Sequence, residues 1–186
     1  PWGEARHQAA IDCYLQVIEK VRPFKVPRVS LEPLWGLCRA YGYAGDLEAA
    51  ESNAQQALEM ARTAGDEWIG HLVRVSLGAA LAMDGRAKAA ARWLKEAAEG
   101  LNRVQDTFGW STAQLWLALN AWWQGEVDTA LRHLSALLPV VSENGYESLL
   151  IKRTHQGLKD DQSAIPLLLE AHRQNIERES TLKLLS

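Results

Sequence analysis

Apolar and small residues recur along the chain with a period of 40 residues. Three glycines, Gly45, Gly85 and Gly125, are spaced by this period. Around each of them, apolar or small residues stand at the same offsets, from eight residues before the glycine to sixteen residues after it. A fixed period of this length is typical of repeat proteins, in which each unit buries its apolar face against its neighbours. The pattern therefore predicts three copies of one structural unit.

Within each copy the spacing of the apolar positions is helical. Offsets −8, −7 and −4 from the glycine fall on one face of a helix, and offsets +5, +9, +12 and +16 form a second stripe of the same kind. The glycine lies between the stripes, where a helix can end in a left-handed residue without steric cost. Small residues at −7 and +5, such as Gly78 and Ala90, would let two helix backbones approach closely. Each copy is thus predicted to be a pair of antiparallel helices joined by a glycine turn.

The predicted fold is all-α: one domain over residues 1–186, built as a right-handed α-α superhelix with a 40-residue period. Pro23, Pro27 and Pro33 predict a linker before the first copy, and Ser111 to Gln114 read as a capping box that opens the third. Both ends of the chain suggest that it was cut from a longer protein. The expected divisions are a partial preceding repeat with a linker (1–28), three repeats (29–68, 69–108 and 109–148) and irregular C-terminal helices (149–186).

Charge and composition narrow the classes of function. The formal net charge is −3, which argues against direct binding of nucleic acid by this domain, because phosphate binding needs a basic surface. No apolar run approaches the roughly 18 residues that span a bilayer, and no signal peptide is recognisable at the N-terminus. We therefore expect a cytoplasmic domain without membrane contact, with Cys13 and Cys38 as buried thiols in a reducing compartment.

Sequence motifs for chemistry are missing. The chain contains no phosphate-binding GxxxxGK[ST] loop, no GxGxxG, no HExxH and no serine in a nucleophile elbow. The histidines are scattered over different predicted elements, without a second ligand at helical spacing, and are expected at the surface or in interfaces. They are His7, His71, His133, His155 and His172. We expect no enzymatic activity, no cofactor and no metal.

One face of the first helix in each copy is apolar and aromatic where a solvated face would be polar. In helical-repeat solenoids this helix lines the concave side, and an exposed apolar patch of this kind usually marks a binding surface. The alternative is that a tight superhelix buries these side chains against each other. If the ligand is anionic, Arg39 is the best candidate contact. The predicted ligand-binding or peptide-binding residues are Trp35, Arg39, Tyr43, Val75, Met83, Leu115, Leu119, Trp122 and Trp123.

The repeat resembles the tetratricopeptide repeat (TPR). The resemblance covers about residues 30–148 and recurs in register in the three copies. It implies a superhelix of helix pairs that binds other proteins. In the first copy the family's leucine, small, aromatic, glycine, alanine and alanine columns are matched by Leu37, Cys38, Tyr41, Gly45, Ala50 and Ala57.

A second resemblance concerns the turns and the C-terminal segment. The Gly45-Asp46 and Gly125-Glu126 turns and the link at residues 65–68 look like the helical repeat regions of large bacterial transcriptional activators of the maltose-regulon and SARP types, in which a repeat domain connects an NTPase module to a DNA-binding domain. Residues 164–171 and 177–185 look like the segment that precedes a C-terminal winged-helix module in some of these proteins. This resemblance implies a domain that binds an effector or a protein partner. Binding would shift the self-association of the protein and be coupled to the neighbouring domains. The alternative is a stand-alone TPR adaptor that docks a peptide or protein in its concave groove.

Overall fold

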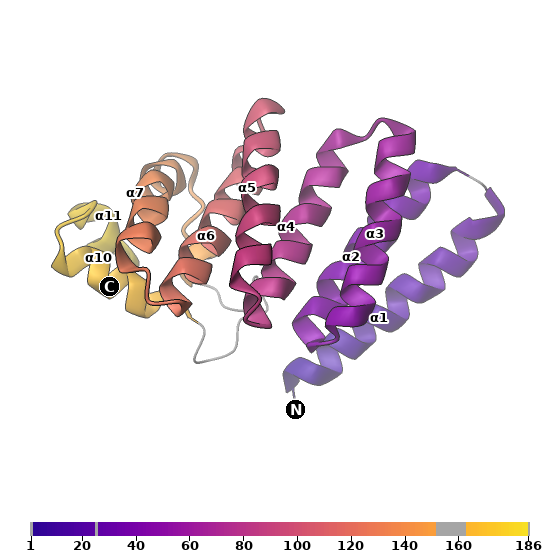
Figure 1. The fold of residues 1–186 in the computed structure, drawn as a ribbon, viewed down its shortest axis with the longest axis horizontal. Helices are drawn as coiled ribbons and strands as arrows, with labels where there is room; N and C mark the ends of the chain where they lie inside the picture. The colour runs from indigo at the N-terminus through magenta and orange to yellow at the C-terminus, as the bar shows by residue number, and fades with distance from the viewer. Residues whose placement is uncertain (1, 25, 152–162, 186) are drawn as a thin grey trace. The chain divides into compact units, whose positions relative to one another are not determined.

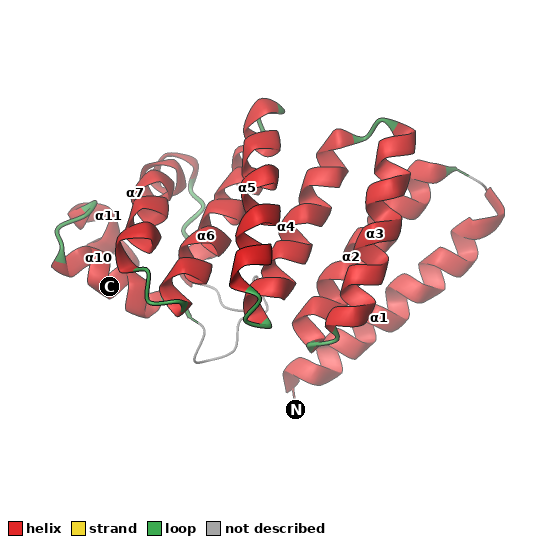
Figure 2. Ribbon diagram, viewed as in Figure 1, coloured by secondary structure: helices red, strands yellow, loops and turns green. Residues whose placement is uncertain are grey.

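The computed structural model describes residues 2–24, 26–151 and 163–185, and all regular structure in these residues is helical (Figure 2). The predicted all-α class is therefore confirmed. The chain divides into two compact units, Pro1–Val104 and Gln105–Ser186, which we call unit 1 and unit 2.

Unit 1 consists of consecutive helices that pack against their neighbours in sequence (Figure 1). Helix α1 packs on α2, α2 on α3 and α4 on α5, while α4 also contacts α2 and α3. The elements are α1 (Trp2–Val21), the 3-10 helix η1 (Arg22–Phe24), α2 (Pro27–Ala44), α3 (Leu47–Ala64), α4 (Glu67–Met83) and α5 (Ala87–Arg103).

Unit 2 repeats the helix pair once and then becomes irregular. Helices α6 and α7 pack together, and α10 and α11 contact each other and α7. Short helices follow at the C-terminal end, and Pro166 lies in the first turn of α10, where proline is tolerated. The elements are α6 (Thr107–Trp123), α7 (Val127–Asn144), α8 (Ser148–Ile151), α10 (Ile165–Arg173) and α11 (Arg178–Leu185).

The glycine turns are as the sequence predicts. Gly45, Gly85 and Gly125 have φ angles of 85°, 81° and 74°, in the left-handed region that glycine adopts without strain. Each turn is followed by the second helix of its pair. Aspartates cap three of the helices. The side chains of Asp46, Asp66 and Asp106 accept hydrogen bonds from backbone N–H groups in the first turns of α3, α4 and α6, respectively.

Small residues set the distance between paired helices. A Cβ atom on Gly78 of α4 would lie 2.6 Å from Cγ of Leu94 on α5, far inside van der Waals contact. Leu94 and Ala90 are both fully buried, so neither helix has room to give way. The predicted role of the small columns, which is to let helix backbones approach, is therefore confirmed for this pair.

Two local predictions are wrong. The expected proline linker is shorter, because α2 already begins at Pro27 and Pro33 lies buried inside it. Pro33 removes only the hydrogen bond to the carbonyl of Val29, an exposed residue whose carbonyl water can satisfy. Ser111 does not open a helix either: it lies inside α6 and donates a 2.8 Å hydrogen bond to the carbonyl of Thr107, while Asp106 is the cap.

The two cysteines differ in environment, which corrects the expectation that both are buried. Cys38 is buried in α2, and burial raises the pKa of its thiol to about 12. Cys13 is exposed on α1. Helix α1 buries one narrow stripe that includes Ile11, 3% exposed, and Cys13 lies two positions further on, away from that stripe.

The left-handed turns lead to a stability prediction. Gly85→Ala forces a Cβ into a left-handed conformation and should lower the free energy of unfolding by about 1–2 kcal/mol. Gly85→Asn should lower the free energy of unfolding by less, because asparagine tolerates the left-handed conformation. Urea denaturation followed by circular dichroism measures both. Equal stability of the alanine variant and the wild type would refute the role given to the turn.

Candidate functional site

The nine predicted binding residues fall on three helices. Trp35, Arg39 and Tyr43 follow one face of α2 at a spacing of four residues, Val75 and Met83 lie on α4, and the remaining four lie on α6 of unit 2. Continuity of this face over all three copies stays a prediction.

Three of the nine are core residues. Val75 is 6% exposed, and Leu115 and Leu119 are fully buried. Their side chains offer no surface to a ligand in this structure. For these three residues, the alternative expectation, that the side chains are buried, is the correct one. The other six are accessible: Arg39 is exposed, and Trp35, Tyr43, Met83, Trp122 and Trp123 are half-buried.

Trp35 is fixed by a hydrogen bond to the neighbouring helix. Its indole Nε1 donates to Oγ of Ser76 on α4 at 2.9 Å. The Ser76 hydroxyl in turn donates to the carbonyl of Leu72 at 3.1 Å, so both polar groups are satisfied. This chain of bonds holds the indole ring in place between α2 and α4.

Arg39 lies between two aromatic rings. Its guanidinium carbon is 6.0 Å from the ring centre of Trp35 and 5.9 Å from that of Tyr43, within the range of cation–π attraction. No ion pair to Arg39 occurs among the residues that the structure describes. We call Trp35, Arg39 and Tyr43 the α2 patch. It presents an exposed cation between two aromatic rings, of which the Trp35 ring is held by Ser76.

Tyr43 also contacts α1. Its ring centre is 5.9 Å from that of His7, with the ring planes at 50°. Burial raises the pKa of the Tyr43 phenol to about 12, although the nearby charge of Arg39 acts in the opposite direction. The hydroxyl therefore stays protonated at neutral pH. Burial also lowers the pKa of His7.

In unit 2 the predicted tryptophans pack partly on their own helix. Trp123 meets the buried Trp116 edge to face, with ring centres 6.2 Å apart and an angle of 72°. The two residues are seven positions apart and share one face of α6. Trp123 therefore uses part of its ring surface for packing within the helix.

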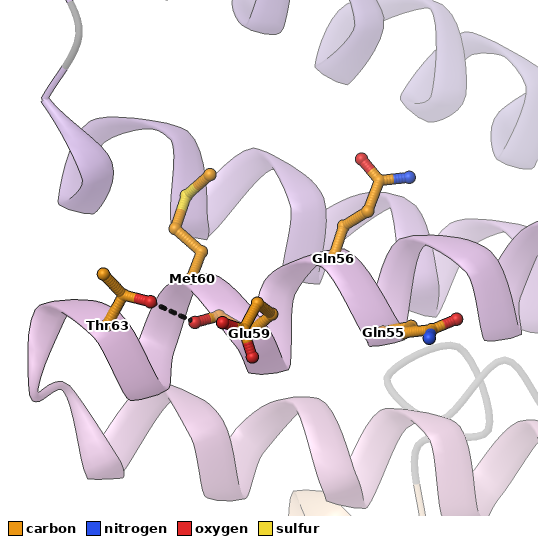
Figure 3. A pocket seen from close by; sticks show the side chains of 5 residues that line it. All are labelled: Gln55, Gln56, Glu59, Met60 and Thr63. Carbon is orange, nitrogen blue, oxygen red and sulfur yellow. Dashed lines mark hydrogen bonds between the residues drawn. The ribbon is translucent and has the colours of Figure 1, made fainter.

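A shallow depression on α3 has a mostly apolar lining, and Figure 3 shows the side chains around it. Gln56 and Met60 project from the same side of the helix, and the Thr63 hydroxyl donates to the carbonyl of Glu59 at 2.9 Å. All lining residues come from one helix, and only Met60 is partly buried. The depression does not assemble groups from different elements, so it does not form a chemical site.

A second hollow, of about 360 Å³, lies in unit 1 beside the α3–α4 turn. Its lining includes His71 and Arg74 of α4 and Arg103 at the end of α5. The sequence analysis placed His71 at a surface or interface, whereas its side chain is only 8% exposed. The equivalent positions in the other two copies, Leu31 and Ser111, are buried as well, but the residue types at the three positions share no apolar character that would have predicted this.

Metal ligands do not assemble in residues 2–24, 26–151 and 163–185: no three side chains of histidine, cysteine, aspartate or glutamate come together there. His155 lies outside the described residues. Every described helix is too short or too polar to cross a lipid bilayer. No protein-family model matches the chain, and no curated protein matches it.

The raised pKa of the half-buried Tyr43 gives a pH prediction. Its pKa is about 12 when folded and near 10 when unfolded, so the unfolded chain releases the proton first as pH rises. This group's contribution to stability is complete below pH 10 and falls as pH rises towards 12. Subtracting the ultraviolet phenolate titration of Tyr43→Phe from that of the wild type should show one tyrosine ionising near pH 12. An ionisation near pH 10 would contradict the desolvation of the Tyr43 hydroxyl that raises its pKa.

Proposed function

We propose that this chain is a TPR-like sensing and protein-interaction domain of a bacterial transcriptional regulator. It binds an effector or a protein partner in the cytoplasm and couples that binding to neighbouring domains. The second candidate is a stand-alone TPR adaptor that docks a peptide or protein in its groove. Both are non-enzymatic binding functions and share the same recognition surface.

The observation that carries the proposal is the α2 patch. Tryptophan, tyrosine and arginine are the residue types that contribute most to the energy of protein interfaces. Here one of each is gathered on a single helix face, and the indole is already held by Ser76. A surface held in its binding conformation before contact loses little side-chain entropy on association.

The charge of the α2 patch selects the partner. Arg39 is exposed and stacked on aromatic rings, without a carboxylate partner among the described residues. A planar guanidinium held in this way pairs well with a carboxylate that arrives from outside. We therefore propose that the partner is a protein segment that contains aspartate or glutamate beside an apolar side chain.

The regulator assignment rests on the second sequence resemblance and is tested in the gene. If it is right, the coding sequence around this chain specifies an NTPase module and a DNA-binding module. A gene that specifies neither module would favour the stand-alone adaptor.

A peptide-binding experiment tests the α2 patch. A displayed library of random peptides is selected on the wild-type domain, and the best peptide is titrated by fluorescence anisotropy. Arg39→Ala should weaken binding about tenfold or more, which is typical of a central interface arginine. The peptide affinity of Arg39→Lys should lie between those of the wild type and Arg39→Ala, because lysine keeps the charge but lacks the flat stacking group.

The matched control is Arg92→Ala. Arg92 is also exposed and stacked on a tryptophan, 5.3 Å from the ring of Trp93, but it lies on α5, outside the patch. Arg92→Ala changes the net charge by the same amount as Arg39→Ala. Because Arg92 lies outside the α2 patch, the peptide affinity of this variant should stay near that of the wild type. Equal effects of Arg39→Ala and Arg92→Ala, or selected peptides without acidic residues, would reject the proposed recognition surface.

A further inference from the structure

The hollow beside the α3–α4 turn brings together the ends of three helices of unit 1. It is lined by the C-terminal end of α3 with the turn that follows it, by the N-terminal half of α4 and by Arg103 in the last turn of α5. Figure 1 shows the α3–α4 turn and the end of α5 at the same end of unit 1. The first turn of α4 is capped by Asp66 and lends the hollow the positive end of a helix dipole.

His71 lines this hollow and carries an unpartnered polar atom. The side chain is more than nine-tenths buried, and its Nδ1 has no hydrogen-bond partner in the part of the chain that the structure describes. Buried polar atoms are almost always paired, because leaving one unpaired costs free energy. An unpaired nitrogen on an imidazole that lines a hollow therefore indicates a missing partner.

Two glycines inside helices make room for the basic side chains. A Cβ atom on Gly100 of α5 would lie 2.0 Å from Cε1 of the His71 ring, and one on Gly70 would lie 3.2 Å from Nη1 of Arg74. Glycine weakens the interior of a helix. At both positions it leaves space that a polar or charged group occupies.

Comparison with the other two repeats shows that this arrangement belongs to the second copy alone. The positions equivalent to His71 and Gly100 hold Leu31 with Met60 in the first copy and Ser111 with Val140 in the third. The histidine thus occurs together with the glycine that accommodates it. Ordinary repeat packing needs neither residue.

The two arginines of the hollow are also specific to the second copy. The equivalents of Arg74 and Arg103 are neutral or acidic in the other copies, namely Leu34 with Thr63 and Gln114 with Glu143. Packing between repeats therefore does not require these two arginines. Both lie close enough to His71 for their charges to lower its pKa, in addition to the larger effect of burial.

The carboxylates of the lining do not neutralise this cationic set. Asp66 caps α4 through the N–H of Ile69 at 3.2 Å and lies 3.5 Å from Arg28, while Glu67 raises the pKa of His71 only as the smallest of the effects on it. Arg74 has one long contact, 3.8 Å to Glu96, and no ion pair of Arg103 occurs among the described residues.

We propose that this hollow binds the phosphate group of a small molecule, held by Arg74, Arg103 and His71 at the N-terminal end of α4. Guanidinium groups and helix N-termini are the usual phosphate ligands in proteins. Two arginine forks and an imidazole supply more donors than one carboxylate accepts, which favours phosphate. A hollow of about 360 Å³ also leaves room for an organic part. This site stands independently of the α2 patch.

The test follows the imidazole resonance of His71 by NMR, identified by its loss in His71→Gln. Inorganic phosphate is titrated into the domain, and sodium chloride at equal ionic strength and acetate serve as comparisons. Phosphate should shift the resonance saturably and raise the pKa of His71, because a bound anion favours the imidazolium. Glycerol 2-phosphate should bind more tightly if the natural ligand has an organic part, and no more tightly if the ligand is free phosphate.

Variants at the surface keep the proposal testable even if His71→Gln unfolds. Arg74→Gln and Arg103→Gln should each weaken phosphate binding about tenfold, the loss expected for one charged hydrogen bond. The control Arg92→Gln removes the same charge from α5 outside the hollow and should bind like the wild type. The proposal is overturned if acetate or chloride shifts His71 as phosphate does, or if Arg92→Gln weakens binding as much as Arg103→Gln. Peptide binding at the α2 patch should not change in either arginine variant.

Discussion

The close approach of the two helices in each pair is the constraint on which the rest of the structure depends. Between α4 and α5, Leu94 occupies the space that a Cβ atom on Gly78 would need. The equivalents of Ala90 in the other pairs, Ala50 and Ala130, are fully buried as well. Helices at this distance bury their apolar stripes completely, and that burial stabilises a helix pair far more than helix propensity does. The glycine turn then only has to reverse the chain.

The same constraint determines where polar groups can be placed. Positions that face the partner helix are mostly small or apolar, and the large imidazole ring of His71 fits there because it lies opposite Gly100. Positions away from the partner helix are free to vary. On α2 they hold the aromatic and cationic α2 patch, which is tied to α4 through Ser76. Both proposed binding sites therefore use positions that the repeat leaves available.

The period and the turns were predictable from the sequence, because helix pairing depends on contacts that recur at fixed spacing. Local signals were less dependable. Ser111 resembles a cap but lies inside α6, since Asp106 stands at the true start of the helix. Pro33 lies within α2, and the exposure of its neighbour Val29 makes the missing hydrogen bond tolerable. Helix periodicity also failed for Leu115, whose burial depends on packing between residues distant in sequence.

The most direct test of this account is the stability of Gly78→Ala, measured by urea denaturation. Alanine is the better helix former by about 1 kcal/mol, so if helix propensity decided the fold, this substitution would stabilise the domain. If the approach of α4 and α5 decides it, the new methyl group collides with the buried Leu94, and the variant should be less stable than the wild type by about 1–3 kcal/mol. A more stable Gly78→Ala variant would contradict the account.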